Sequence, residues 1–210
     1  MFVLIKREIK DNIIFFIASP ILSAIFIVFM ISMAYLFESD IFAAYTSGLS
    51  LQVIVLLAIV FFSLGFMQMR IDRIRGVSTF LSTQPSTRSR ILFTKIITGI
   101  LAILTFFVPV IIIGVSLLRL FIQQIPTHPG IFVEMLTVAI LMAFACYCIG
   151  LQTGWTISRI TSIIGGIFIT CILFSLVLIR GFDLHVIVIL VLFIIASLLR
   201  TWQKFMSTPL

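Results

Sequence analysis

Six long apolar runs, separated by short polar stretches, set the hydrophobic pattern of this chain. The runs are residues 13–37, 48–69, 91–118, 131–156, 160–179 and 184–199. The hydrocarbon core of a bilayer is about 30 Å thick and takes about 20 apolar residues per helix, so most of the runs are long enough to cross it. The uninterrupted part of the sixth run would reach only about 21 Å as a helix, and we expect Trp202 and Phe205 to extend it. The pattern predicts an all-α membrane protein with six transmembrane helices.

Residues 1–12, before the first run, have the pattern of an amphipathic helix. Apolar positions recur there at helical spacing, and three cations lie on the opposite face: Lys6, Arg7 and Lys10. A helix of this kind lies along the headgroup boundary, with its cations facing anionic lipid. We therefore expect an interfacial helix at 1–12 and a six-span domain at 13–210. The alternative is that the cations only flank the first span.

The basic residues are divided unevenly between the two sides of the six-run pattern. Two of the fourteen, Arg119 and Arg180, fall on one side, together with four of the seven acidic residues. The others lie in alternate connections or at their margins: Lys6, Arg7, Lys10, Arg70, Arg73, Arg75, Arg88, Arg90, Lys95, Arg159, Arg200 and Lys204. The positive-inside rule then predicts a multi-pass protein of a cell (plasma or inner) membrane, with both termini cytoplasmic. The net charge of +7 is a topology signal and needs no nucleic-acid partner.

Composition limits what else the chain can contain. Hydrophobic residues make up 62% and charged residues 10% of the 210 positions, which excludes ordinary soluble and disordered chains. Six spans and short loops use nearly all of this length, so any soluble activity must come from another chain. The cysteines Cys146, Cys148 and Cys171 lie in apolar runs, where thiols behave as small hydrophobic residues and indicate no disulfide framework.

The sequence indicates no catalytic or metal site. It has no phosphate-binding P-loop, no His-Glu-x-x-His, no Cys-x-x-Cys pair and no Gly-x-Ser-x-Gly elbow. His128 and His185 both map to outer connections and could jointly bind a metal or haem iron, but two loop histidines without a third ligand are usually ordinary polar loop residues. Lys95 and Glu134 lie near the ends of predicted spans, where snorkelling would explain them. Since the span interiors hold few charges, we expect the energy source to lie in another chain.

Residues 70–90 are the one sizeable connection on the cytoplasmic side. Apolar residues recur in it at helical spacing: Ile71, Ile74, Val77 and Leu81. Pro85 biases the residue before it away from the α conformation, so a short helix should stop near Thr83. A hydroxyl in residues 86–89 can cap the helix that continues into span three. We expect a short helix parallel to the membrane, joined by a sharp turn to a spanning helix; the alternative is an ordinary basic loop.

This segment resembles the cytoplasmic coupling region of the type-2 ABC exporter permeases. In that family an acidic residue, a glycine, a leucine pair, a proline, an arginine and a lysine recur between spans two and three. The corresponding positions here are Asp72, Gly76, Phe80, Leu81, Pro85, Arg88 and Lys95. Residues 5–11 resemble the family's N-terminal interfacial helix, so the resemblance covers nearly the whole chain. The chain departs from the family at Ser78 and Thr79, where an acidic residue often follows the glycine, and at Asp72, where glutamate is usual.

The resemblance implies the transmembrane permease subunit of an ATP-driven ABC transporter, an exporter with no catalytic activity or cofactor of its own. A separate nucleotide-binding ATPase subunit would hold ATP and Mg²⁺. A second permease chain, identical or different, would complete the translocation path, and membrane lipid would surround both. The residues expected to couple the chain to the ATPase are Asp72, Ile74, Gly76, Val77, Phe80, Leu81, Pro85 and Arg88.

Gly150 and Gly154 have the small-xxx-small spacing that lets a second helix approach closely, and we expect them at a helix-packing contact. Gly165 and Gly166 could act in the same way.

Two other functions fit parts of the sequence. The haem-exporter permease of cytochrome c maturation has a similar length and topology, although no tryptophan-rich outer motif is visible here. A structural or assembly subunit of a membrane complex is the second alternative. An intramembrane enzyme has less support, because no span carries a cluster of polar residues.

Overall fold

The computed structural model describes residues 2–36, 55–71, 88–121, 129–155 and 159–207. Seven helices make up almost all of this described part: α1 (Phe2–Asp11), α2 (Ile13–Leu36), the helix Val55–Ile71, α5 (Arg88–Phe121), α6 (Pro129–Trp155), α7 (Arg159–Arg180) and α8 (Leu184–Ser207). The described residues include no β-strand. A helix satisfies its backbone polar groups within one segment, which suits a chain surrounded by hydrocarbon. The predicted all-α class is confirmed.

Four of these helices are long and apolar enough to cross a membrane: Ser89–Ser116, Val133–Trp155, Thr161–Arg180 and Leu184–Met206. The bent pair α1 and α2 would give a fifth, and Val55–Ile71 is a shorter apolar helix. The protein is therefore membrane-embedded, while the count of six spans stays a prediction. The expected extension of the last helix through Trp202 and Phe205 is confirmed, because α8 runs to Ser207.

The first two helices are separated by a single residue, Asn12. The axis of the chain bends there by 70°. The carbonyl oxygen of Glu8, near the end of α1, accepts hydrogen bonds from the backbone nitrogen of Asn12 at 3.0 Å and from the side-chain nitrogen of Asn12 at 2.9 Å. The carbonyl oxygen of Asn12 accepts from the backbone nitrogen of Phe15, at 3.0 Å, at the start of α2. The same residue thus ends one helix and begins the next.

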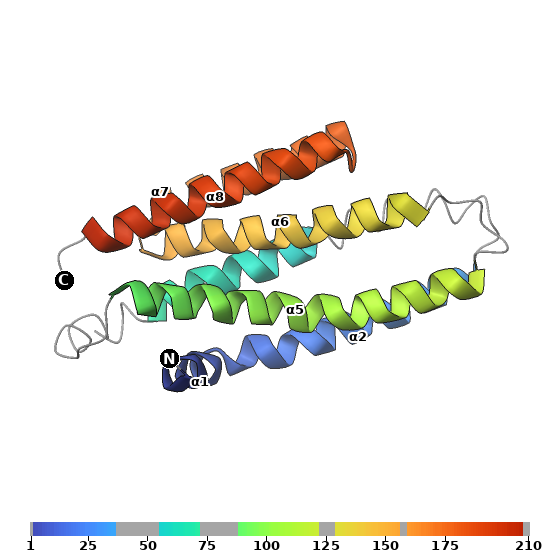
Figure 1. Cartoon of the computed structure of the whole chain (residues 1–210), viewed down its shortest axis with the longest axis horizontal. Helices are drawn as coiled ribbons and strands as arrows, with labels where there is room; N and C mark the ends of the chain where they lie inside the picture. Colours follow the sequence, from blue (N-terminus) through green and yellow to red (C-terminus); the bar gives the residue numbers. More distant parts are fainter. Residues whose placement is uncertain (1, 37–54, 72–87, 122–128, 156–158, 208–210) are drawn as a thin grey trace.

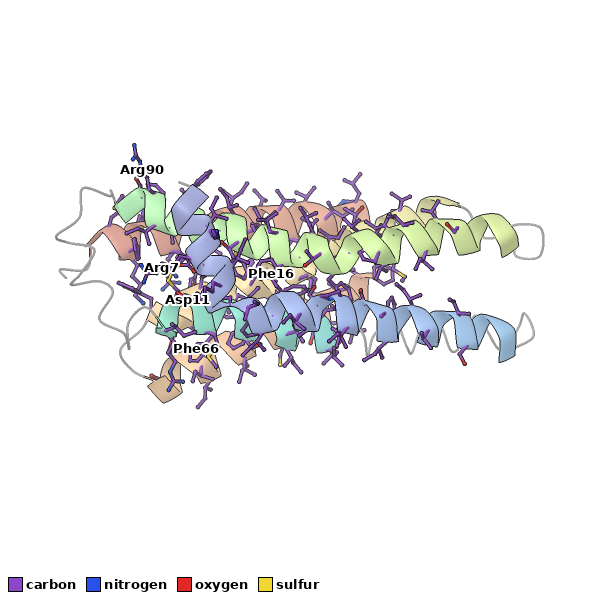
Figure 2. The ribbon with its side chains drawn as sticks, turned by 90° about the horizontal axis from the view of Figure 1, so that it is seen from below. Arg7, Asp11, Phe16, Phe66 and Arg90 are labelled. Carbon is purple, nitrogen blue, oxygen red and sulfur yellow. The ribbon has the colours of Figure 1, made fainter. Side chains whose placement is uncertain are left out.

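From α2 onward, and counting Val55–Ile71 between α2 and α5, successive helices run in opposite directions along one bundle (Figure 1). Helix α2 packs on α5, α5 packs on α6 and α8, and α6 also packs on α7 and α8. Helix α1 lies across one end of the bundle and contacts the first part of α5 (Figure 2). Of the four candidate spans α6 is the most enclosed, with 56% of its most apolar window buried, against 17% for α7. Helix α6 is therefore the centre of the bundle, and α7 lies at its edge.

Glycines bring Val55–Ile71 and α6 into backbone contact. A Cβ atom on Gly150 would overlap the carbonyl oxygen of Phe62, and one on Gly154 would lie 2.6 Å from the carbonyl oxygen of Phe66. A Cβ atom on Gly65, from the other side, would overlap the carbonyl oxygen of Tyr147. Gly150 and Gly154 therefore lie where two helices meet without intervening side chains, a packing mode that membrane helices use widely.

Candidate functional site

The residues that the sequence singled out are distributed over three regions. Those expected to contact an ATPase between Asp72 and Pro85 lie outside the described residues, as does His128. Arg88 is the first residue of α5. The cations of α1 are exposed: Lys6, Arg7 and Lys10. Arg7 also approaches Asp11, one helical turn away, with 3.7 Å between the Arg7 Nε and an Asp11 carboxylate oxygen.

Lys95 departs from what the sequence predicts. Its expected snorkelling to a membrane surface is wrong, because the residue is fully buried. It lies about two turns into α5, and α1 packs over this part of the helix. The side-chain nitrogen donates hydrogen bonds to a carboxylate oxygen of Glu8 at 3.0 Å and to the carbonyl oxygen of Gln68 at 3.1 Å. The charge is met inside the protein by an acidic residue on α1.

Both members of the ion pair are largely covered by protein. The side chain of Lys95 is 1% exposed and that of Glu8 is 14% exposed. Removing one member of a buried pair typically costs about 3–5 kcal/mol, because the remaining charge has no partner, whereas replacing both members by apolar residues is often neutral. The pair therefore adds little net stability compared with apolar packing. What it does supply is a fixed geometry between α1 and α5.

Tyr147, in the last third of α6, joins the same cluster. It is fully buried, and its hydroxyl oxygen lies 2.7 Å from the side-chain oxygen of Gln68 and 2.8 Å from the carbonyl oxygen of Lys95. A phenol has one hydrogen and can donate to only one of these acceptors at a time. With the Gln68 amide turned over, its nitrogen would donate to the phenol oxygen and the phenol would donate to Lys95, so that both contacts become hydrogen bonds.

The same rotation also gives the buried side-chain nitrogen of Gln68 a hydrogen-bond partner. In the orientation that leaves its oxygen against Tyr147, the buried side-chain nitrogen of Gln68 has no hydrogen-bond partner in the described part of the chain. An unpaired buried N–H is rarer in proteins than an under-satisfied carbonyl oxygen. We therefore assign the turned orientation, which leaves only an oxygen to be satisfied.

Gly99 leaves space for the Tyr147 ring. A Cβ atom on Gly99, one turn after Lys95 in α5, would overlap ring atoms of Tyr147. Nearby hydroxyls satisfy themselves within their own helix: Thr98 donates to the carbonyl oxygen of Thr94 at 2.8 Å, and Thr94 donates to that of Arg90 at 2.7 Å. We call the cluster of Glu8, Gln68, Lys95 and Tyr147 the polar junction. It draws one side chain from each of α1, Val55–Ile71, α5 and α6.

Other polar contacts within the bundle each tie one pair of helices. Between α2 and α5, the hydroxyl of Ser19 donates to the carbonyl oxygen of Ala102 at 3.2 Å. Between α6 and α8, the amide nitrogen of Gln152 donates to the hydroxyl and carbonyl oxygens of Ser197, at 2.7 and 2.8 Å. The polar junction differs from both because it joins four helices and contains a charge pair.

The contacts of the polar junction fix the positions of helices relative to one another. Among the described residues there is no group of three or more His, Cys, Asp or Glu side chains that could hold a metal ion. The Lys95 nitrogen is engaged by a Glu8 carboxylate oxygen and by the Gln68 carbonyl oxygen. The arrangement fixes four helices relative to one another at one end of the bundle, the end at which Figure 2 labels Arg7, Asp11 and Arg90.

Sequence reasoning missed the polar junction, although a signal existed. A lysine after the start of an apolar run needs either water or an acidic residue from the same side of the membrane. On the side where the basic residues gather, the acidic residues are Glu8, Asp11 and Asp72. On the predicted amphipathic helix Glu8 lies one turn after Ile5, at the border of the apolar face and away from the cations, and this position marks it as the inward-facing candidate.

Comparison with known proteins gives no match to a protein family, to a curated protein or to a solved structure.

Proposed function

We propose that this chain is the transmembrane permease subunit of an ATP-driven transporter, with the ATPase on a separate chain. In this proposal six helices cross a cell membrane, both termini are cytoplasmic, and α1 lies at the headgroup boundary. Residues 70–90 contact the ATPase, and a second permease chain completes the path for the transported molecule. The transporter is an exporter, as the resemblance to the type-2 ABC permeases implies.

The observation that carries the proposal is the position of the polar junction along the chain. Gln68 lies three residues before Ile71, where a described helix ends, and Lys95 lies seven residues after Arg88, where α5 begins. The hydrogen bond from Lys95 to the Gln68 carbonyl oxygen therefore joins the two helices that flank residues 72–87. A coupling segment needs its two flanking helices to be joined in this way, because a force applied to the segment must move the helices and not only the connection between them.

The distribution of charge also supports an external energy source. The charge pair of Glu8 and Lys95 is at one end of the bundle and both members are partnered. The other acidic and basic residues of the four candidate spans are exposed and lie toward the ends of their helices: Arg90, Glu134, Arg180, Arg200 and Lys204. Charged residues inside a membrane normally mark an ion or proton path. This placement fits a subunit driven through its contact with an ATPase better than a proton-driven carrier.

Purification of the tagged chain in mild detergent tests the proposal. We expect a nucleotide-binding chain to co-purify and the eluate to hydrolyse ATP. Leu81→Asp would place an ion in a desolvated contact at a cost of several kcal/mol, and since about 1.4 kcal/mol is tenfold in affinity, the ATPase recovered should fall at least tenfold. Membrane insertion of the chain should be unchanged, because residue 81 lies outside the apolar runs.

Two variants serve as controls for this experiment. Leu81→Met keeps the apolar volume, and Arg73→Lys keeps the charge, so both should recover as much ATPase as the wild-type chain. Wild-type chain that purifies with no ATP-hydrolysing partner would contradict the permease function and leave a structural or assembly subunit. Normal recovery of ATPase by Leu81→Asp would contradict docking through residue 81 alone.

A further inference from the structure

One residue, Lys95, contacts three parts of the protein that are far apart in the sequence, two through its side chain and one through its backbone. Its nitrogen contacts Glu8 and Gln68, which are 87 and 27 residues away. Its own carbonyl oxygen lies 2.8 Å from the hydroxyl of Tyr147, 52 residues away. The fully buried Lys95 is thus the common point of α1, Val55–Ile71, α5 and α6.

Helix α1 has two different attachments to the rest of the protein. Along the chain it joins α2 through Asn12 alone, with a bend of 70°. Across the bundle it packs on α5, where Glu8 meets Lys95. A connection of one residue can act as a hinge, because hinges are a few positions at element ends that absorb changes in backbone angles. The ion pair, by contrast, sets the position of α1 on α5.

We propose that Lys95 is a positioning residue that makes α1 move as one unit with the start of α5 and the end of Val55–Ile71, turning about Asn12, when ATP binds to the complex. This inference rests on the proposed permease function. It assigns α1 a part in transmitting motion, in addition to lying at the membrane surface.

A purely stabilising contact would behave differently from a positioning contact. Apolar packing between α1 and α5 would hold the helix against the bundle but would not fix one register, since the hydrophobic effect is non-directional. A charge-assisted hydrogen bond has a preferred distance and direction. The Lys95 ammonium group also donates to the Gln68 carbonyl oxygen, and this second bond limits its freedom to follow α1 if α1 moves alone. The Tyr147 hydroxyl meets the backbone carbonyl oxygen of Lys95 and so ties the same turn of α5 to α6.

Distance measurements between spin labels test the proposal in the intact complex with its ATPase. Three exposed positions carry the labels: Lys10 on α1, Arg90 on α5 and Arg200 on α8. The exposed native thiol, Cys171, is replaced by serine. Spectra are taken without nucleotide and with ATP, Mg²⁺ and vanadate. We expect the distance from 10 to 200 to shift by about 2 Å or more, the scale of helix displacements in switching proteins, while the distance from 10 to 90 stays unchanged.

Removing the charge of Glu8 should separate α1 from α5. In Glu8→Gln the distance from 10 to 90 should also shift with ATP, because the amide keeps the shape of the side chain but loses the charge pair. The matched control is Asp11→Asn, the same change on the same helix at a residue whose ion pair is with Arg7 of α1 itself. It should behave as the wild-type chain. If Glu8→Gln does not fold, the apolar double variant Glu8→Leu/Lys95→Met replaces it, since apolar substitution of a buried pair is tolerated.

The outcomes separate the two proposals. An unchanged distance from 10 to 200 on addition of ATP, or equal shifts of both distances in the wild-type complex, would overturn the role of Lys95 while the bound ATPase still supports the permease function. The same conclusion follows if Glu8→Gln and Asp11→Asn behave alike. Absence of an ATPase from the wild-type complex overturns both proposals.

Discussion

The polar junction and helix α7 represent two ways of placing helices in the same bundle. At the polar junction, buried charged and amide groups meet at hydrogen-bond distances of 2.7–3.1 Å, and α6 is the most enclosed candidate span. Helix α7 is the least enclosed, and large apolar side chains such as Ile164, Phe168 and Ile179 are exposed along it.

The difference lies in what each region does for the fold. Directional contacts specify one arrangement, so the polar junction determines how α1, Val55–Ile71, α5 and α6 sit relative to one another. The exposed face of α7 has hydrocarbon as its natural neighbour in a membrane, and lipid is as apolar as the side chains it meets. Substitutions should therefore be costly at the polar junction and cheap on α7, which the following three pairs of variants measure.

The largest difference should come from Lys95→Ala compared with Ile179→Ala. Loss of the ammonium group leaves the Glu8 carboxylate without its partner, and we expect a fall of about 3–5 kcal/mol in the free energy of unfolding. Ile179 is 82% exposed, and its truncation should stay within about 0.5 kcal/mol of wild type. Reversible unfolding in mixed detergent micelles measures both values.

The apolar double variant Glu8→Leu/Lys95→Met sharpens this first comparison. It removes both charges, so it should recover most of the stability that Lys95→Ala loses. A double variant as unstable as Lys95→Ala would show that the cost comes from the lost hydrogen bonds of Lys95 to Glu8 and to the Gln68 carbonyl oxygen and not from an uncompensated charge, because methionine keeps most of the methylene packing.

Most of the fold can be predicted from the sequence, because apolar runs and helix lengths are local properties. The runs 13–37, 131–156 and 160–179 correspond to Ile13–Leu36, Pro129–Trp155 and Arg159–Arg180, with ends that differ by two residues or fewer. In a membrane the backbone must pair within the segment, so an apolar run of this length has few alternatives to a helix.

The polar junction could not be predicted in the same way, because it depends on contacts between distant segments. The burial of Lys95 requires α1 to fold back over α5, and that follows from the bend at Asn12 and from the reach of Glu8 across 87 residues. Neither the bend nor the long-range contact produces a periodic pattern in the sequence. A lysine near the start of a span can either extend to the membrane surface or be buried and paired, and only its surroundings in the folded protein distinguish these two cases.

An intermediate difference should appear between two glycines, one on α6 and one on α7. In Gly150→Ala the added methyl group would overlap the carbonyl oxygen of Phe62, and backbone cannot move aside as a flexible side chain can, so we expect a loss of about 1–3 kcal/mol. Nothing lies within 4 Å of a Cβ atom at Gly165, so Gly165→Ala should gain up to about 1 kcal/mol from helix propensity. The same unfolding measurement applies, and equal losses for the two variants would contradict the close contact at Gly150.

The smallest difference should separate two hydroxyl groups, those of Tyr147 and Ser175. Tyr147→Phe keeps the ring that fills the space over Gly99 and removes only the hydroxyl between Gln68 and Lys95. Hydrogen bonds between membrane helices contribute about 0.6 kcal/mol on average, and up to about 1.7 kcal/mol, which sets the expected loss. Ser175→Ala removes an exposed hydroxyl that bonds within α7, to the carbonyl oxygen of Cys171, and should change stability by less. A loss for Tyr147→Phe as large as that for Lys95→Ala would show that the phenol, and not the ion pair, holds the polar junction together. A loss no larger than that for Ser175→Ala would remove Tyr147 from it.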